Sequence, residues 1–182
     1  MATWTAATAI PSGGLITSAW MNNVTGMVNF LGATSATAGK DLFFARQTVS
    51  QSISATGAYT ALTFTTEDID VAGGHSTTSQ QSRYTAQAAG KYRLTGSISV
   101  PASVTAGQMI GAFYKNGSLI SAGAKGAFNV VNTTNEQSFI MPNLYTSLAA
   151  NDYVELYVYK IVSFSTDVSI SQSTFGVEWV GA

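Results

Sequence analysis

The 182-residue sequence contains no cysteine, one histidine and three prolines. Without cysteine, a disulfide framework, a thiol nucleophile and a Cys-ligated metal site are all excluded. Charge is also scarce, because Asp, Glu, Lys and Arg make up 9% of the chain, against about 25% in ordinary soluble domains. The eight basic residues are scattered singly and the formal net charge is -1. Since phosphate backbones are bound by clustered Lys and Arg, nucleic-acid binding is not expected.

Long apolar runs are absent as well. No stretch approaches the roughly 18 residues of a membrane-spanning helix, and the N-terminus lacks the pattern of a signal peptide. We therefore expect no membrane insertion, and export, if it occurs, by a route such as lysis. Hydrophobic residues still make up 46% of the chain and aromatic residues 11%, which is enough to fold around a core. The largely neutral surface predicts a subunit covered by copies of itself or by partners, rather than a free enzyme.

The first 39 residues contain no charged side chain, and this boundary predicts two parts: an N-terminal segment, 1–39, and a β-domain, 40–182. An amphipathic helix is expected at about 18–31, followed by a flexible linker that ends at residue 39. So short a helix is only marginally stable alone, so it is expected to pack either on its own β-domain or on another protein. The lack of charge favours the second alternative, in which the helix is an anchor. The apolar residues expected to attach the chain are Trp4, Leu15, Ile16, Trp20, Val24, Met27 and Leu31.

From residue 41 onward, short segments of alternating apolar and polar residues are separated by turn residues. This pattern predicts an all-β antiparallel sandwich or barrel. Asn116-Gly117 predicts a β-hairpin. One face of the segment 91–100 carries Tyr92, Leu94, Ile98 and Val100, which predicts a core-facing side. The strands are expected at 44–53, 59–65, 81–87, 91–100, 108–115, 128–132, 137–146, 153–161, 168–171 and 174–180.

The strand expected at 153–161 has two different faces. Val154, Leu156 and Val158 are suited to a core. Tyrosine is enriched where a surface is dry on one side and wet on the other. The opposite face is therefore interpreted either as a second packed layer or as a subunit interface, and a trimerising sandwich satisfies both. The candidates for that trimer interface are Tyr153, Tyr157 and Tyr159.

Several segments of the β-domain resemble, in the family's order, the signature of C1q/TNF-like domains. Residues 84–96 (YTAQAAGKYRLTG) resemble its G-x-Y-x-[FL] segment, and 113–117 (FYKNG) its KNG hairpin. Residues 148–156 (LAANDYVEL) are similar to its L-x-x-GDxVxL strand, with Asn151 in place of the usual glycine, and 173–177 (STFGV) to its terminal strand. The resemblance covers about 43–182 and implies a ten-stranded jelly-roll β-sandwich that forms a homotrimer.

The N-terminal segment resembles the start of small virion proteins of tailed bacteriophages. Trp4, the run 14–22 (GLITSAWMN) and the pair Phe30-Leu31 are similar to their W-x-G-x-x-V-T-A-x-x-M-N motif and the helix after it. In such proteins the leader attaches to the particle and a C1q-like head projects outward. The resemblance implies a place on the particle exterior, other virion proteins bound through residues 1–39, and a head that adheres to a host-surface glycan or protein.

Two groups of residues in the middle of the chain could carry catalysis or bind a metal ion. His75 lies in a Gly- and Ser-rich loop, and no G-x-S-x-G elbow is present, so an exposed polar loop is expected rather than a Ser–His–Asp triad. Glu67, Asp68 and Asp70 form an acidic cluster. Carboxylates at such spacing can hold Ca²⁺, but the regular D-x-D-x-D-G loop is missing, which favours a solvated strand end.

The pair Glu155 and Glu178 lies on late strands. A glycoside hydrolase needs two carboxyl groups about 5–10 Å apart; these two could approach each other, but no pattern in the sequence selects them. No other catalytic pattern is present, and the sequence predicts no catalytic residue, metal or cofactor.

Together, the two resemblances and the composition predict a trimeric bacteriophage virion protein of the head-fibre or tail-fibre type. Its C1q-like head is expected to serve host adhesion, and the protein is not expected to be an enzyme. Two alternatives stay open. One is a capsid or tail decoration protein that only stabilises the particle, and the other is a glycan-degrading virion enzyme.

Overall fold

The computed structural model describes residues 41–53, 57–101, 106–131, 134–161 and 168–181. Within these residues the chain is built from strands and one 3-10 turn, and no helix among them is long and apolar enough to cross a membrane. The helix and linker expected within 1–39 lie outside the described residues. The elements are β1 Leu42–Arg46, β2 Gln51–Ile53, β3 Tyr59–Ala61, β4 Thr66–Asp70, β5 Arg83–Thr85, β6 Gly90–Val100, β7 Gly107–Lys115, β8 Ser118–Leu119, η1 Ala122–Ala124, β9 Lys125–Val130, β10 Gln137–Ile140, β11 Leu144–Leu148, β12 Tyr153–Lys160, β13 Val168–Ile170 and β14 Thr174–Gly181.

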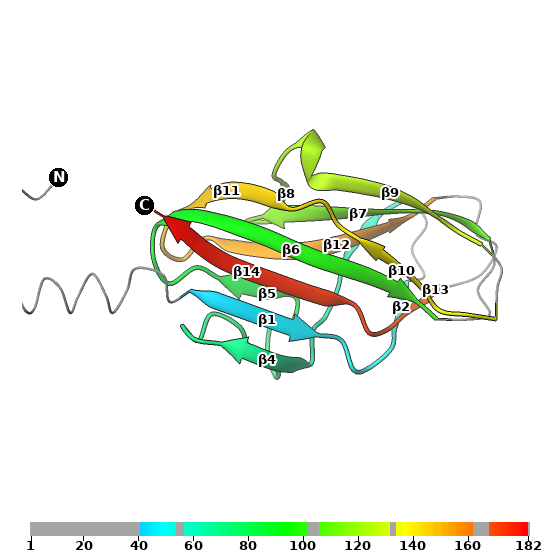
Figure 1. Ribbon diagram of the computed structural model, residues 1–182, viewed down its shortest axis with the longest axis horizontal. Helices are drawn as coiled ribbons and strands as arrows, with labels where there is room; N and C mark the ends of the chain where they lie inside the picture. The colour runs from blue at the N-terminus through cyan, green and yellow to red at the C-terminus, as the bar shows by residue number, and fades with distance from the viewer. Residues whose placement is uncertain (1–40, 54–56, 102–105, 132–133, 162–167, 182) are drawn as a thin grey trace, which may run out of the picture. The chain divides into compact units, whose positions relative to one another are not determined.

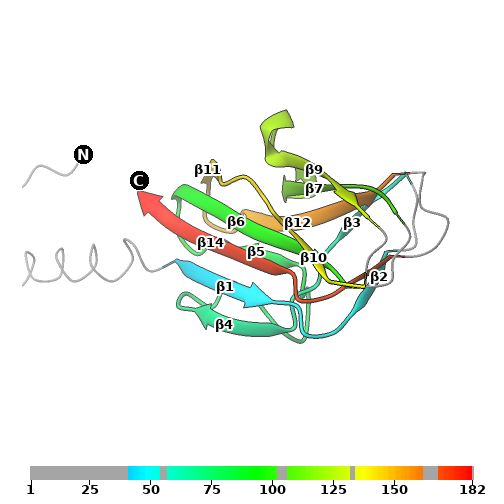
Figure 2. The ribbon, with the colours of Figure 1, turned by 45° about the vertical axis from the view of Figure 1, so that its right-hand side comes forward.

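The strands form two antiparallel sheets that pack face to face (Figure 1). The β6 sheet has the order β10-β6-β14-β1-β4, with β11 also beside β6. The β12 sheet has the order β3-β12-β7-β8, with β5 beside β12 and β9 beside β7. A pair of short strands, β13 and β2, lies at one end of the sandwich (Figure 1; β2 is also labelled in Figure 2). The antiparallel jelly-roll sandwich predicted from the sequence is confirmed.

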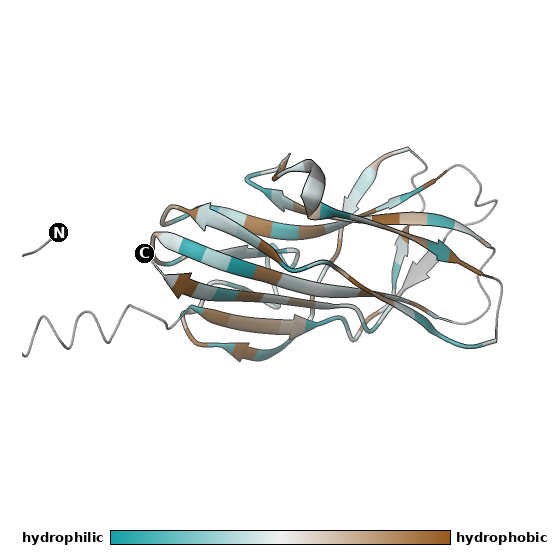
Figure 3. Cartoon of the chain, turned by 45° about the horizontal axis from the view of Figure 1, so that its top comes forward, coloured by the Kyte–Doolittle hydropathy of each residue, from teal (hydrophilic) through white to brown (hydrophobic). Residues whose placement is uncertain are grey.

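The core lies between the two sheets and is formed by every second residue of the long strands. All four residues assigned to the inner face of β6 are fully buried, as are Val154, Leu156 and Val158 on β12. The ring of Phe175 on β14 lies 5.6 Å from that of Phe43 and 6.2 Å from that of Phe113, so it bridges the sheets. Figure 3 shows brown and teal residues following one another along single strands, as expected for sheets with one face on a core.

Several strand predictions differ from the structure, and three of the differences have a clear cause. The strand expected at 44–53 is two strands, because β1 ends at Arg46 and β2 begins at Gln51. The strand expected at 137–146 is interrupted around Pro142, which cannot donate to a ladder. The acidic segment Thr66–Asp70, taken as a solvated strand end, is the edge strand β4. Its exposed position explains why it lacks a clear apolar alternation.

Two asparagines adopt left-handed backbone conformations at tight turns. Asn116 and Gly117 have φ of 49° and 75°, as a type I′ turn requires, and Lys115 pairs with Ser118 across it. Asn151, which stands where the C1q/TNF-like signature has glycine, has φ of 72°. Asparagine tolerates this region better than other non-glycine residues, so the departure from the signature preserves the turn.

This geometry predicts the result of replacing Asn151. Asn151→Gly is expected to leave the free energy of unfolding within about 0.5 kcal/mol of the parent, because glycine adopts a positive φ without strain. Asn151→Val is expected to lower it by about 1–2 kcal/mol, because a β-branched side chain is strained there. Urea unfolding of the two variants measures the difference. Equal stability of the glycine and valine variants would contradict the assigned turn.

Candidate interaction surfaces

Two of the four segments that resemble the C1q/TNF-like signature, 113–117 and 148–156, meet at one end of the β12 sheet. The Lys115 ammonium lies 2.7 Å from Oδ2 of Asp152, and Nδ2 of Asn116 donates to Oδ1 of Asp152 at 2.7 Å. The backbone N–H of Ala149 also donates to this carboxylate, and that of Tyr153 donates to the Asn116 side chain. The hydrogen bonds from Lys115, Asn116 and Ala149 lower the pKa of Asp152 to about 2. These contacts of Asp152, which we call the clasp, fix the β7–β8 hairpin to the start of β12.

The aromatic stripe predicted on β12 is part of a larger cluster on the outer face of the β12 sheet. The Tyr114 ring stacks on that of Tyr157 at 4.2 Å, and the Tyr59 ring lies 5.0 Å from that of Tyr159 and 5.5 Å from that of Tyr114. Sequence reasoning missed Tyr59 and Tyr114, because only the register of β3 and β7 against β12 brings them there. We call this surface the tyrosine face; its members, all partly exposed, are Tyr59, Tyr114, Tyr153, Tyr157 and Tyr159.

A buried carboxylate lies among these rings. The side chain of Glu155 is 3% exposed; it accepts hydrogen bonds from Ser82 Oγ at 2.7 Å and from the Tyr157 hydroxyl at 3.1 Å. Burial, reinforced by the charge of Glu155, raises the pKa of Tyr157 to about 12. Nε of Arg83 lies 3.5 Å from Glu155, and its guanidinium carbon stacks 4.0 Å above the centre of the Tyr153 ring. The cation thus compensates the buried charge from the rim of the tyrosine face.

The carboxylate pair considered for glycan cleavage is separated by the sandwich. Glu155 points outward from the β12 sheet, whereas Glu178 points outward from the β6 sheet and pairs with Arg93. Two carboxylates on opposite outer faces cannot flank one glycosidic bond.

The three residues of the acidic cluster have separate partners. Asp68 accepts hydrogen bonds from Nε of Arg46 at 3.0 Å, and Glu67 bonds to His75. The Asp70 carboxylate accepts the backbone N–H groups of residues 73, 74 and 75 at 2.9–3.1 Å. Within the described ranges no group of three or more His, Cys, Asp or Glu side chains is placed to hold a metal ion. The calcium hypothesis therefore gains no support from the placement of these residues.

The side chain of His75 is buried, and His75 is not the exposed loop residue expected from the sequence. Its side chain is fully buried and stacks on Phe43 with 4.9 Å between ring centres. Nδ1 lies 2.7 Å from Oε1 of Glu67, and Nε2 lies 3.1 Å from the carbonyl oxygen of Gln81. Through its two ring nitrogens, His75 thus contacts Glu67 on β4 and the backbone of Gln81 ahead of β5. His75 thereby ties the segment between β4 and β5 to the edge of the sandwich.

The outer face of the β6 sheet exposes large apolar side chains. Ile140 on β10 is 78% exposed and Tyr145 on β11 is 63% exposed, both at one edge of the sheet. Leu42 on β1 and Ile69 on β4 lie toward the other edge and are about two-fifths exposed. We call this surface the apolar face; its members are Leu42, Phe44, Ile69, Ile140 and Tyr145.

A shallow, largely apolar hollow of about 260 Å³ lies on the apolar face. Gly176 and Thr95 are among its lining residues, and a Cβ on Gly176 would be 2.5 Å from the Thr95 hydroxyl. Its rim includes Leu42, Phe44 and Ile69, and the ion pair of Arg93 with Glu178 lies beside it. One edge of this face therefore protrudes, whereas the other is recessed.

The predicted attachment residues lie outside the described residues, and their role stays a prediction. They are Trp4, Leu15, Ile16, Trp20, Val24, Met27 and Leu31.

The low pKa of Asp152 predicts a pH-dependent contribution to stability. A carboxylate whose pKa is about 2 in the fold and about 3.9 in the unfolded chain contributes fully above that unfolded value. The contribution declines as the pH falls toward 2. Asp152→Asn is therefore expected to cost about 1–3 kcal/mol at neutral pH, and the difference from the parent should shrink in acid.

Urea unfolding at neutral pH and near pH 2.5 measures this difference. Asp68→Asn is the matched control, because its pair with Arg46 is exposed and is expected to contribute at most about 1 kcal/mol. A difference between Asp152→Asn and the parent that stays constant over this range would contradict the clasp.

The two hydrogen bonds of His75 predict a large cost for an apolar replacement. His75→Phe keeps a ring against Phe43 but leaves Glu67 and the carbonyl of Gln81 without their imidazole partner. We expect the free energy of unfolding to fall by about 2–3 kcal/mol. Ser79→Ala, in the exposed part of the same segment, should change it by less than about 0.5 kcal/mol. Thermal unfolding of both variants tests the assignment, which fails if the phenylalanine variant is as stable as the parent.

Comparison with known proteins gives a match in structure alone. No family model matches the sequence, and no curated protein matches it. The globular domain of zebrafish complement 1qA protein superimposes with a TM-score of 0.54 at 14% identity, over 78% of this chain and 97% of that domain. A crystal structure of murine APRIL gives a TM-score of 0.50 at 12% identity, over 76% of this chain and 98% of that one. These matches and the strand order show that the β-domain has the C1q/TNF-like jelly-roll fold.

Proposed function

We propose that this chain is a bacteriophage virion structural protein of the head-fibre or tail-fibre type. Residues 1–39 attach it to other virion proteins, and the C1q/TNF-like head lies on the particle exterior. The observation that carries the proposal is the combination of an uncharged leader, which resembles phage virion proteins, with a head of this fold. Because the leader has no charged residue, it is suited to burial in an interface.

The head is proposed to be a homotrimer, as the C1q/TNF-like resemblance implies. Exposed apolar side chains favour association, and the apolar face carries them at both of its edges. Its protruding edge, with Ile140 and Tyr145, differs from its recessed edge, with the hollow beside Ile69. A protrusion of one copy that enters the hollow of the next makes a head-to-tail contact, and such contacts close into rings. This asymmetry favours a trimer over a two-fold dimer.

The head is proposed to adhere to a host-surface component without catalysis. The tyrosine face supports adhesion, because partly exposed aromatic side chains with polar tips are typical of binding surfaces. The separation of Glu155 from Glu178, and the burial of the His75 ring, support a non-catalytic role. A decoration protein that only stabilises the particle is the main alternative, and a glycan-degrading enzyme is the other.

Labelled antibody on intact particles tests the location, and binding of purified full-length protein to host cells tests adhesion. Label on the particle exterior together with saturable cell binding is expected. Exterior label without cell binding would favour the decoration role. Release of soluble sugar from host envelopes, abolished by Glu155→Gln, would favour the enzyme, and absence of label would overturn the virion assignment.

The trimer gives a direct prediction for mass in solution. Light scattering on the full chain is expected to give about three times the 19.0 kDa of one chain. Ile140→Asp should shift the mass toward one chain, because it places a charge in the proposed contact. Val49→Asp is the matched control, since Val49 is 62% exposed in the β1–β2 loop, and should stay trimeric. A monomeric parent would contradict the trimer, and loss of the trimer in Tyr159→Ser but not in Ile140→Asp would move the interface to the tyrosine face.

A further inference from the structure

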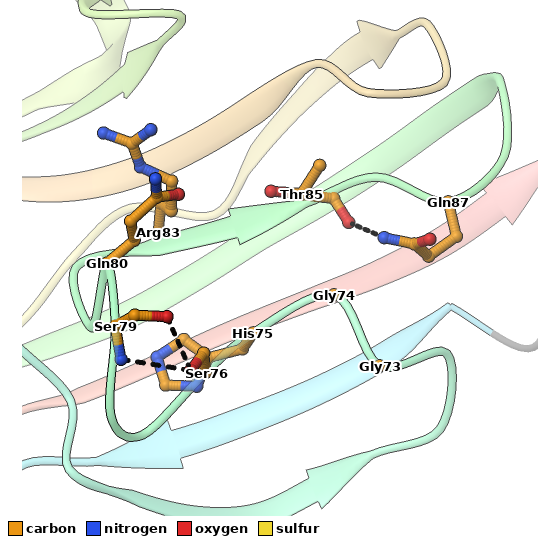
Figure 4. A pocket seen from close by; sticks show the side chains of 9 residues that line it. All are labelled: Gly73, Gly74, His75, Ser76, Ser79, Gln80, Arg83, Thr85 and Gln87. Atoms are coloured by element: carbon orange, nitrogen blue, oxygen red, sulfur yellow. Dashed lines mark hydrogen bonds between the residues drawn. The ribbon is translucent and has the colours of Figure 1, made fainter.

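A polar hollow opens at the edge of the sandwich, where the chain crosses from β4 to β5 (Figure 4). Its volume is about 260 Å³, slightly below the roughly 300–1,000 Å³ of pockets for drug-sized ligands, which suits a ligand the size of one sugar unit. The hollow is distinct from the one on the apolar face. Its lining residues are Gly73, Gly74, His75, Ser76, Ser79, Gln80, Arg83, Thr85 and Gln87.

The walls of this hollow are fixed by interactions on the far side from the opening. The Asp70 carboxylate holds three successive backbone N–H groups of the crossing segment, and the buried His75 ring ties the same segment to the core. The Thr85 N–H donates to the Gly74 carbonyl at 2.8 Å, which joins the segment to β5. Only glycine fits at position 74, because a Cβ would be 2.4 Å from the Tyr84 ring. A site with fixed walls loses little entropy when a ligand binds.

Several polar side chains at the hollow have unused hydrogen-bonding capacity. Within the described part of the chain, the side chains of Gln80 and Thr85 make no hydrogen bond. The Gln87 amide donates to the Thr85 carbonyl and keeps its own oxygen available as an acceptor. Amide and hydroxyl groups of this kind match the alternating donors and acceptors of sugar hydroxyls.

Arg83 supplies a positive charge at the rim, on the side of β12 (Figure 4). Its guanidinium carbon lies 4.0 Å above the centre of the Tyr153 ring, and Nε lies 3.5 Å from Glu155. The side chain remains 30% exposed, and none of the nine lining residues is acidic. A stacked guanidinium is pre-oriented for a planar carboxylate. The exposed part of the guanidinium therefore offers a cationic hydrogen-bond donor to an anionic ligand, although its charge is shared with Glu155.

We propose that this hollow binds an acidic sugar residue, a uronic or sialic acid unit of a surface polysaccharide. Arg83 bonds the carboxylate, and Gln80, Thr85 and Gln87 bond the hydroxyl groups. The inference rests on the proposed host-surface adhesion and names its ligand class. An open hollow binds a single unit weakly, and three copies in one particle subunit raise the strength by avidity.

Three variants and one control test the site. Arg83→Gln removes the charge, and Arg83→Lys keeps a cation beside Glu155 but loses the planar fork. Gln80→Gly removes an exposed side chain at a position with φ of 53°, where glycine is unstrained. Arg46→Gln is the control, because it makes the same charge change on the opposite sheet, where Arg46 pairs with Asp68.

Ligand-observed NMR titration of the full-length protein uses digalacturonate, a hyaluronan tetrasaccharide and sialyllactose, with galactobiose, chitobiose and lactose as neutral counterparts. At least one acidic probe should bind more tightly than its neutral counterpart. Arg83→Gln should weaken that probe about tenfold and Arg83→Lys about fivefold, as expected for a charge-assisted pair. Gln80→Gly should weaken it about threefold, and Arg46→Gln should leave it unchanged.

The inference is overturned if no acidic probe binds at about 20 mM, or if Arg46→Gln weakens binding as much as Arg83→Gln. If Arg83→Gln does not fold, Arg83→Lys and Gln80→Gly decide the outcome. Host-cell binding that persists in Arg83→Gln, with no acidic probe bound, would reject this site and leave adhesion intact. Binding of an acidic probe without any host-cell binding would reject adhesion and leave the site intact.

Discussion

The contact of Phe175 with the rings around it is the interaction on which the rest of the structure depends. Phe175 lies on the central strand β14 and reaches Phe113 on the opposite sheet, while Phe43 and Phe64 flank it. The sheets also approach closely at Gly96, where a Cβ would lie 3.0 Å from Leu156. Once this contact fixes which residues point inward, alternation assigns every other residue to one of two outer faces. The tyrosine face and the apolar face are both consequences of that assignment.

The sequence predicted the fold well where the pattern was strong and local. The inner faces of β6 and β12, the Asn116-Gly117 turn and the jelly-roll resemblance were all confirmed, because each depends on residues close in sequence or on a regular period. The edge strand β4 was missed, since an exposed edge needs no apolar alternation. His75 was misjudged for a related reason: its Gly- and Ser-rich neighbours indicate a loop, and only the fold brings Phe43, Glu67 and Gln81 around its ring.

The candidate surfaces were only partly accessible to sequence reasoning. One strand revealed a tyrosine stripe, but its extension through Tyr59 and Tyr114 depends on strand order, which no local pattern encodes. The apolar face depends on the order of the six strands of the β6 sheet, many of which are far apart in the chain. Arg83 could not be recognised at all from its neighbours in sequence, because its position is defined by Tyr153 and Glu155, seventy or more residues away.

The few charges of the head are mostly matched in pairs. All three arginines lie against a carboxylate, Arg46 with Asp68, Arg83 with Glu155 and Arg93 with Glu178. Paired charges leave almost no long-range field around the molecule, so a partner is not drawn in from a distance. Encounters should then proceed at the unsteered rate of about 10⁵–10⁶ M⁻¹s⁻¹ and vary little with ionic strength. The rate at which this domain meets any partner would then be nearly the same at low and high salt, and the strength of the association would be set by the dissociation rate.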